Sequence, residues 1–166
     1  GSSLYDQAQK AESLSDYKSS ADLYGRAADI FERCAAWKNY ATARYQEGIQ
    51  LLALEESEKA LALFEKLKSV VVEKIGPKAN VYALICHNLG ELYFRINKPK
   101  QSLENFNLAL TALKDLFGVR SKEVALCLYN IGNSLESAGN FREAINKHLN
   151  SLSIKKSLQI ADSAEL

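Results

Sequence analysis

The 166-residue sequence contains no methionine, two prolines and three cysteines, and its apolar residues never form a long run. A membrane-spanning helix needs about 20 consecutive apolar residues, so we expect none. The scarcity of proline excludes collagen-like and proline-rich linker classes. Three widely spaced cysteines do not form the paired framework of a small secreted domain. We therefore expect a cytoplasmic protein, with association with the cytoskeleton as an open alternative.

An excess of charge of one sign is also missing. The chain has 21 Lys+Arg and 20 Asp+Glu, which leaves a formal net charge of +1. Because nucleic-acid binders and proteins attached to acidic lipids usually carry a clear basic excess, we expect no nucleic-acid partner and no membrane insertion. The chain starts with Gly-Ser-Ser, and we interpret residues 1–3 as an expression scar.

Residues that favour helices fill most of the sequence, and no segment alternates in the manner of a strand. Asp16, Ser57 and Ser121 are predicted to cap the starts of helices, whereas Gly76 and Gly139 are predicted to follow helix ends. These breaks predict eight helices, at about 4–14, 17–34, 38–54, 58–75, 80–96, 99–117, 122–138 and 141–160.

The sequence repeats itself with a period of 42 residues. Glycines at positions 48, 90 and 132 are each followed, in the next predicted helix, by a ring at Phe64, Phe106 and His148. A weaker first copy has Tyr24 as its ring. Two antiparallel helices approach closely where side chains are small, and a large ring fills the space where they diverge. One such pair buries one face, so stacked pairs are needed for a continuous core.

These residues resemble the tetratricopeptide repeat (TPR) family. Leu89-Gly90 with Tyr93, and then Ser102, Phe106 and Ala109, match its pattern, and Gly139-Asn140-Phe141 before Ala144 matches its turn. The long repeats are similar to those of kinesin light chains and the Pins/LGN adaptors. HEAT and armadillo arrays have similar repeat lengths, but the small-residue positions favour TPR.

The resemblance implies an all-α, right-handed superhelical solenoid of four helix-turn-helix repeats. We expect a single domain over residues 4–163, with repeats at about 4–36, 37–76, 77–119 and 120–163. The weak first repeat and His148, which replaces an aromatic residue in the last, depart from the family pattern.

In such arrays the first helix of each repeat lines a concave groove. The resemblance implies that Asn88 and Asn130 bind the main chain of an extended partner, because a carboxamide can donate and accept hydrogen bonds at once. The groove positions predicted from the register are Tyr45, Gln46, Ile49, Leu84, His87, Asn88, Glu91, Arg95, Leu126, Tyr129, Asn130 and Asn133.

The resulting prediction is a protein–protein interaction module that binds a partner peptide or helix in its groove. An alternative is a scaffold or assembly segment that associates with itself or docks through its ends or convex face. The C-terminal helix would offer apolar surface for this at Leu149, Leu152, Ile154, Leu158 and Ile160. The paired cations that grip Hsp90 and Hsp70 C-terminal tails in some TPR proteins are missing from the matching positions, so we expect no binding of those tails.

We expect no enzymatic activity. Cys86 and His87 are adjacent, but neighbouring helical residues point about 100° apart and do not form a nucleophile–base pair. Cys86 and Cys127 fall at positions that face the second helix of their repeats, which predicts buried thiols. The chain has no nucleotide-binding or metalloprotease motif, and two histidines with scattered cysteines do not make a zinc set. We therefore expect no cofactor and no metal.

Overall fold

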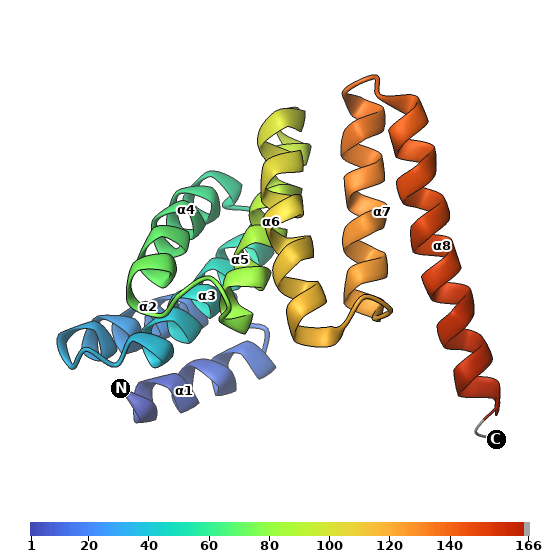
Figure 1. Cartoon of the computed structure of the whole chain (residues 1–166). Helices are drawn as coiled ribbons and strands as arrows, with labels where there is room; N and C mark the ends of the chain where they lie inside the picture. Colours follow the sequence, from blue (N-terminus) through green and yellow to red (C-terminus); the bar gives the residue numbers. More distant parts are fainter. Residues whose placement is uncertain (165–166) are drawn as a thin grey trace. The chain divides into compact units, whose positions relative to one another are not determined.

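The computed structural model describes residues 1–164, with side chains through Gln159. In this range the chain forms eight α-helices joined by short turns (Figure 1). They are α1 Ser2–Ser13, α2 Tyr17–Arg33, α3 Trp37–Ala53, α4 Ser57–Lys74, α5 Asn80–Arg95, α6 Pro99–Phe117, α7 Lys122–Ser137 and α8 Phe141–Ala164.

The predicted helices are confirmed, and most bounds differ by one or two residues. The helix α1 begins at Ser2, within the residues interpreted as a scar, and α8 continues to Ala164 instead of ending near residue 160. Ile160 lies outside the described side chains. The Asp16 carboxylate accepts from the Ser19 amide at 3.1 Å, as its predicted capping role requires. The prediction for Ser57 is wrong, because the chain enters α4 one residue earlier and Glu56 occupies the N-cap without a side-chain bond.

One helix-ending turn occurs in all four repeats, and a fifth copy at Ala35, with a φ of 53°, joins α2 to α3. Ser15, Glu55, Asn97 and Gly139 adopt positive φ values of 60°, 61°, 55° and 79° between the two helices of each repeat. After each of them, the next amide donates to the carbonyl five residues back, as from Asn140 to Leu135 at 2.8 Å. This bond satisfies a carbonyl that the helix end leaves open. Glycine fits the left-handed conformation best, and four of the five turns lack it.

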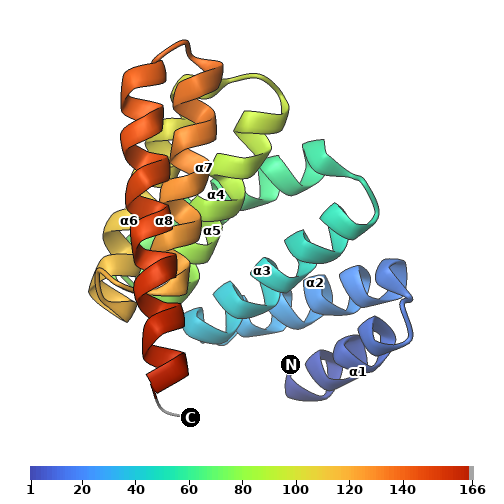
Figure 2. The same ribbon diagram turned by 90° about the vertical axis from the view of Figure 1, so that its right-hand side faces the viewer.

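The helices gather into two compact units. Unit 1 is Gly1–Pro77 and contains α1–α4, and unit 2 is Lys78–Leu166 and contains α5–α8 within the described residues. In each unit consecutive helices pack against each other. In unit 2, α7 lies between α6 and α8, and Figure 2 shows the same unit from the side. The division falls in the linker between α4 and α5.

Glycine and a ring meet inside three of the helix pairs. A Cβ atom added at Gly48 would lie 2.5 Å from the Phe64 ring, and one at Gly90 would lie 2.6 Å from the Phe106 ring. Both rings are buried, which confirms the predicted wedge. In the last pair Gly132 faces His148, whose side chain stays 30% exposed. The final wedge is therefore less closed than the earlier ones.

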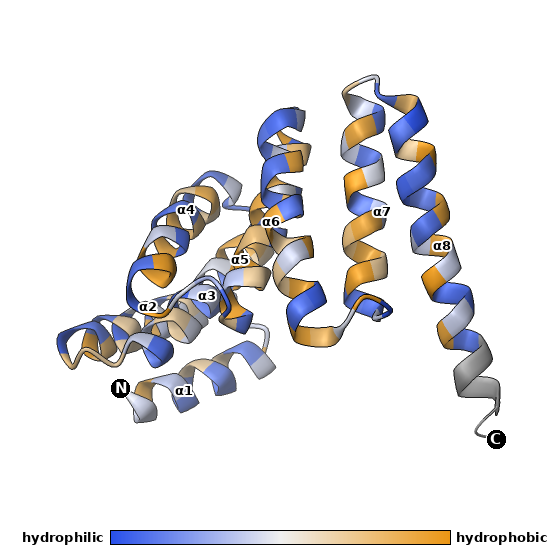
Figure 3. Ribbon diagram, viewed as in Figure 1, coloured by the Kyte–Doolittle hydropathy of each residue, from blue (hydrophilic) through white to orange (hydrophobic). Residues whose placement is uncertain are grey.

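A buried serine joins the helices of a pair near the same crossing. The Ser20 hydroxyl donates to the Ala8 carbonyl at 3.0 Å, and the Ser102 hydroxyl to the Gly90 carbonyl at 2.9 Å. Each bond satisfies a hydroxyl that would otherwise be costly to bury. Figure 3 shows apolar residues recurring along the length of α7, which packs between α6 and α8.

Candidate functional site

The predicted groove residues of unit 1 lie on α3. Tyr45, Gln46 and Ile49 are all half-buried. The Tyr45 ring packs against the Phe64 ring with centroids 5.8 Å apart, so its orientation is tied to the core wedge. A partner could therefore contact only part of each of these three side chains.

In unit 2 the structure brings three predicted groove residues together across α5 and α7. His87 Nε2 lies 3.2 Å from Glu91 Oε1, one helical turn away. The Asn130 amide nitrogen, on α7, lies 3.3 Å from the same carboxylate oxygen and 3.5 Å from His87 Nε2. The Glu91 carboxylate on α5 thus accepts from the Asn130 amide nitrogen, and the Asn130 carbonyl oxygen takes no part in that bond.

This cluster perturbs the Glu91 carboxylate. A hydrogen bond from His87 is the largest influence and lowers the pKa of Glu91 below its ordinary value of 4.5, and bonding from Asn130 acts in the same direction. Partial burial opposes the shift. Glu91 is therefore an anion near neutral pH, and its side chain remains 49% exposed.

His87 departs from expectation. The register places it on the groove surface as an exposed side chain, but only 19% of it is exposed. The edge of its ring packs against Phe106, with centroids 5.4 Å apart. The aromatic wedge is next to this position, which a linear register does not reveal. His87 therefore acts on the surface mainly through Glu91.

Asn88 also has an internal partner. Its amide nitrogen donates to the Leu84 carbonyl at 3.0 Å, which is a bond back to its own helix. Two further predicted groove residues, Leu84 on α5 and Leu126 on α7, have exposed side chains. Tyr129 is exposed too, and its ring lies beside the His148 ring and 5.3 Å from the Lys155 ammonium.

A small cavity of about 190 Å³ opens beside the cluster. The predicted residues Glu91, Arg95, Asn130 and Asn133 line it, so the structure brings these four together. Its remaining walls are Phe94, which is exposed, and Phe106, which is buried. The result is an aromatic floor with carboxylate, carboxamide and guanidinium groups at the rim.

Two residues that were not predicted from the sequence take part in specific contacts: Phe94 lines the cavity, and Arg44 forms ion pairs. Phe94, a wall of this cavity, lies three residues beyond Glu91, so the same helical spacing that selects Glu91 indicates it. Arg44 of unit 1 pairs with Asp29 on α2 and with Glu47 at 2.7 Å on its own helix. No family motif marks the Arg44 position.

The cysteines agree with the structural prediction made for them. Cys86 and Cys127 are buried, and Cys34 is exposed. The Cys127 thiol donates to the Phe106 carbonyl at 3.3 Å, and burial raises its pKa to about 12. Within the described part of the chain, His, Cys, Asp and Glu nowhere gather in a group of three that could hold a metal. A search of the same residues for a helix able to cross a membrane finds none.

The family model of the tetratricopeptide repeat matches residues 39–115 and 82–157. The chain belongs to the tetratricopeptide repeat family. TPR domains generally act in protein–protein interaction, and the stacked helix pairs described above are their architecture. The predicted all-α solenoid is therefore confirmed, and the HEAT and armadillo alternatives are not needed.

Individual relatives agree with this assignment. Anaphase-promoting complex subunit 3 of Schizosaccharomyces pombe is 30% identical over 98 residues, which are 59% of this chain and 13% of that protein. A putative kinesin light chain with TPR-like repeats from Podosopora anserina superposes with a TM-score of 0.77 at 10% identity, over 93% of this chain and 74% of that one. The expected likeness to kinesin light chains is thereby confirmed for the fold.

A third relative has a bound peptide. The Rap conjugation gene regulator of the plasmid pLS20, in complex with the Phr* peptide, superposes with a TM-score of 0.71 at 17% identity. The match covers 94% of this chain and 42% of the regulator. Because the chain spans a small part of the curated relative and less than half of this regulator, their activities and partners are not transferred to it.

Proposed function

We propose that the protein binds an extended segment of a partner protein along α5 and α7, the first helices of the two repeats in unit 2. The observation that carries the proposal is the cluster of Glu91 and Asn130 at the rim of the aromatic cavity. The peptide complex of the structurally similar Rap regulator supports the choice of a peptide over a folded surface.

The chemistry of the rim defines what the segment must offer. Asn130 Oδ1 and Glu91 Oε2 accept no hydrogen bond from any described residue. Both are acceptors, so they suit peptide N–H groups or a cationic side chain of the partner. The Asn130 amide nitrogen, by contrast, is engaged with α5. Asn130 would therefore only accept hydrogen bonds from the main chain of the partner. The resemblance had implied that its carboxamide both donates and accepts them.

The remaining groove positions would determine which side chains of a partner segment the site prefers. The cavity accepts one apolar or aromatic side chain between Phe94 and Phe106, and Arg95 beside Glu91 favours a partner with both charges. The other proposed contact positions of unit 2 are Leu84, His87, Asn88, Leu126, Tyr129 and Asn133. Unit 1 has its own proposed contact positions on α3, at Tyr45, Gln46 and Ile49. A few hydrogen bonds of about 1 kcal/mol each and one apolar anchor predict a modest affinity.

The test selects peptides from a random display library with the whole chain and measures their affinity by fluorescence anisotropy. We expect the variant Asn130→Ala with Glu91→Gln to weaken the enriched peptides at least about 10-fold, which corresponds to roughly 1.4 kcal/mol. Asn107→Ala is the matched control, because Asn107 is an exposed carboxamide on α6. Equal affinity of the peptides for the double variant and the control would refute the proposed site.

A further inference from the structure

Glu91 is a carboxylate at a place where the neighbouring repeats have none. With the 42-residue register, its counterparts are Ile49 in the preceding repeat and Asn133 in the following one. The packing of a helix pair therefore does not require an acid at this position. A half-exposed carboxylate that the fold does not need is a candidate for recognising a partner.

The negative charge of Glu91 has no Lys or Arg partner among the described side chains. Its Oε1 atom accepts from His87 and from the Asn130 amide, whereas no described residue donates to its Oε2 atom. The charge of Arg95 helps to lower the pKa of Glu91, but the two side chains form no ion pair in the described part of the chain. Glu91 is thus able to bind a cation of a partner.

The Asn130 carboxamide adds a second acceptor from the neighbouring helix. Because its nitrogen donates to Glu91, its Oδ1 atom is the open end, and the two lone pairs of that atom can serve a main-chain N–H and a further donor. A cationic group that contacts both Glu91 and Asn130 must offer donors in two directions. The planar guanidinium of arginine has five donors and is more weakly hydrated than the ammonium of lysine.

The size of the cavity beside these acceptors limits what enters it. Its volume of about 190 Å³ is below the roughly 300–1,000 Å³ of typical small-molecule sites, so it suits one side chain of a longer segment. The walls at Phe94 and Phe106 favour an apolar side chain there. Side chains on the same side of an extended segment are two residues apart, which places a cation at the rim two residues from this apolar anchor.

We propose that the groove of unit 2 selects partner segments with an arginine two residues from an apolar anchor, and that the guanidinium bridges Glu91 and Asn130. The inference rests on the proposed peptide groove and names the residue that this groove selects. Arg95 lines the same cavity and repels further cations, so a single arginine is favoured over a basic cluster.

The display selection with the whole chain separates this inference from the proposed function. The enriched peptides are expected to share an arginine two residues from an apolar residue. Enriched peptides that lack arginine would overturn the inference and leave the peptide groove intact. A selection that enriches no peptide would overturn both.

A double-mutant cycle measures the contact with the guanidinium. An enriched peptide is compared by fluorescence anisotropy with a version in which citrulline, a neutral residue of nearly the same shape, replaces the arginine. The exchange is expected to weaken binding about 10-fold for the unmodified chain and about 2-fold or less for the Glu91→Gln variant.

Glu104→Gln is the matched control for this cycle. It removes the same charge from an exposed position on α6 that does not line the cavity, and should keep the 10-fold difference between the two peptides. A difference of the same size in Glu91→Gln and Glu104→Gln would overturn the contact, as would equal affinity of both peptides for the unmodified chain.

Arg95→Gln is expected to change the affinity in the opposite direction. Removal of the like charge should tighten the arginine peptide about 2-fold and leave the citrulline peptide unchanged. Weaker binding of the arginine peptide would show that the rim of the cavity binds an acidic side chain, and the proposal would then be wrong.

Discussion

The two units share one helical plan and differ in how they use charge. Unit 1 has ten basic and twelve acidic side chains, whereas unit 2 has eleven basic and eight acidic ones. All Lys and Arg ion pairs of the described side chains lie in unit 1, as between Arg44 and Glu47. In unit 2 the two pairs that occur among the described side chains involve histidines.

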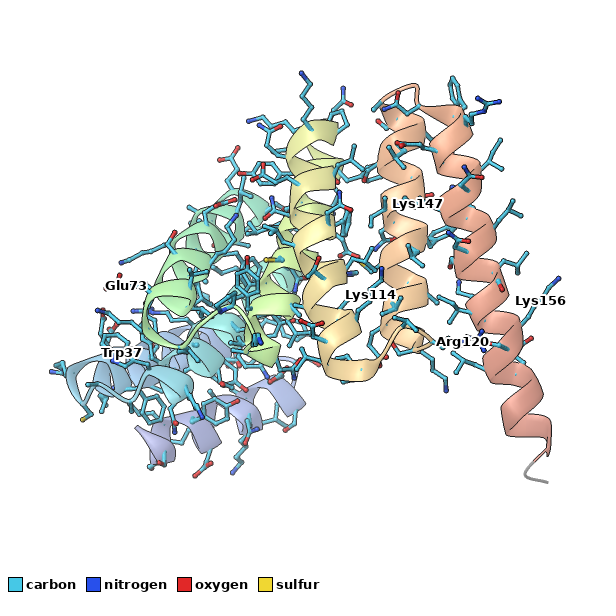
Figure 4. The ribbon with its side chains drawn as sticks, in the orientation of Figure 1. Trp37, Glu73, Lys114, Arg120, Lys147 and Lys156 are labelled. Atoms are coloured by element: carbon cyan, nitrogen blue, oxygen red, sulfur yellow. The ribbon has the colours of Figure 1, made fainter. Side chains whose placement is uncertain are left out.

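The charged side chains of unit 1 thus stabilise its fold by pairing with one another, whereas those of unit 2 stay available to a partner. Arg44 joins α2 to α3 through Asp29, and its guanidinium also lies 5.6 Å from the Tyr40 ring. Lys74 at the end of α4 lies 5.4 Å from the Trp37 ring, which is labelled in Figure 4. The cations of unit 2, by contrast, form no ion pair with a carboxylate in the described part of the chain. They add to the potential that a partner meets.

The largest expected effect concerns the wedge rings. Phe64→Ala and Phe106→Ala each remove a buried ring and are expected to cost about 3–5 kcal/mol, whereas His148→Ala costs about 1 kcal/mol or less because its site is open. Trp37, the single tryptophan, reports on unit 1 by fluorescence, and circular dichroism reports on both units.

Urea unfolding read by both probes distinguishes the units. Phe64→Ala is expected to shift the fluorescence transition, and Phe106→Ala to shift the dichroism transition with little change in fluorescence. Equal shifts of both transitions in each variant would show that the two units unfold as one.

The repeated left-handed turn gives the next effect. Glu55 has a positive φ of 61° in unit 1, and Gly139 holds the same place in unit 2 with a φ of 79°. Glu55→Gly is expected to stabilise unit 1 by about 1 kcal/mol, and Gly139→Ala to destabilise unit 2 by a similar amount, because a Cβ atom disfavours this conformation. Thermal unfolding of the two variants measures whether each change raises or lowers stability. A loss of stability on Glu55→Gly would show that this turn is not strained.

We expect a smaller difference between the units in how far NaCl changes the stability that an arginine contributes. Arg44→Gln breaks two ion pairs at a side chain that is mostly buried, and we expect a loss of about 1 kcal/mol that shrinks as NaCl rises. Arg142→Gln in unit 2 is the control, because its exposed guanidinium pairs with no described carboxylate. Urea unfolding at two salt concentrations provides the comparison, followed by Trp37 fluorescence for Arg44→Gln and by circular dichroism for Arg142→Gln, and a salt-independent loss for Arg44→Gln would count against the ionic origin.

The smallest effect is the titration of Glu91. The folded pKa lies below 4.5, so its contribution to stability is present at neutral pH and is lost as pH falls through the folded pKa, where the unfolded chain binds more protons. His87→Ala is expected to raise the pKa of Glu91, because the bond from His87 is the largest cause of the shift. Carboxyl chemical shifts followed by NMR measure this, and Asn107→Ala should leave the value unchanged.

The sequence predicts helices and wedges well because both depend on local spacing. Gly90 and Phe106 sit in contact since small and large residues recur at fixed positions, and the same reasoning finds Gly132 beside His148. Side-chain partners do not follow from such spacing. The half-buried state of His87 and the engaged amide of Asn130 depend on neighbours one helix away, and so does the bridge that Arg44 makes.

The most direct test of the proposed recognition site is to map a bound peptide onto unit 2. Backbone amide shifts of the full chain, recorded while a display-selected peptide is added, should change at Glu91, Asn130 and Asn133 and saturate at micromolar concentration. The same titration of the Asn130→Ala, Glu91→Gln variant should show little change. Shifts confined to other surfaces, or equal in both proteins, would contradict the proposed site.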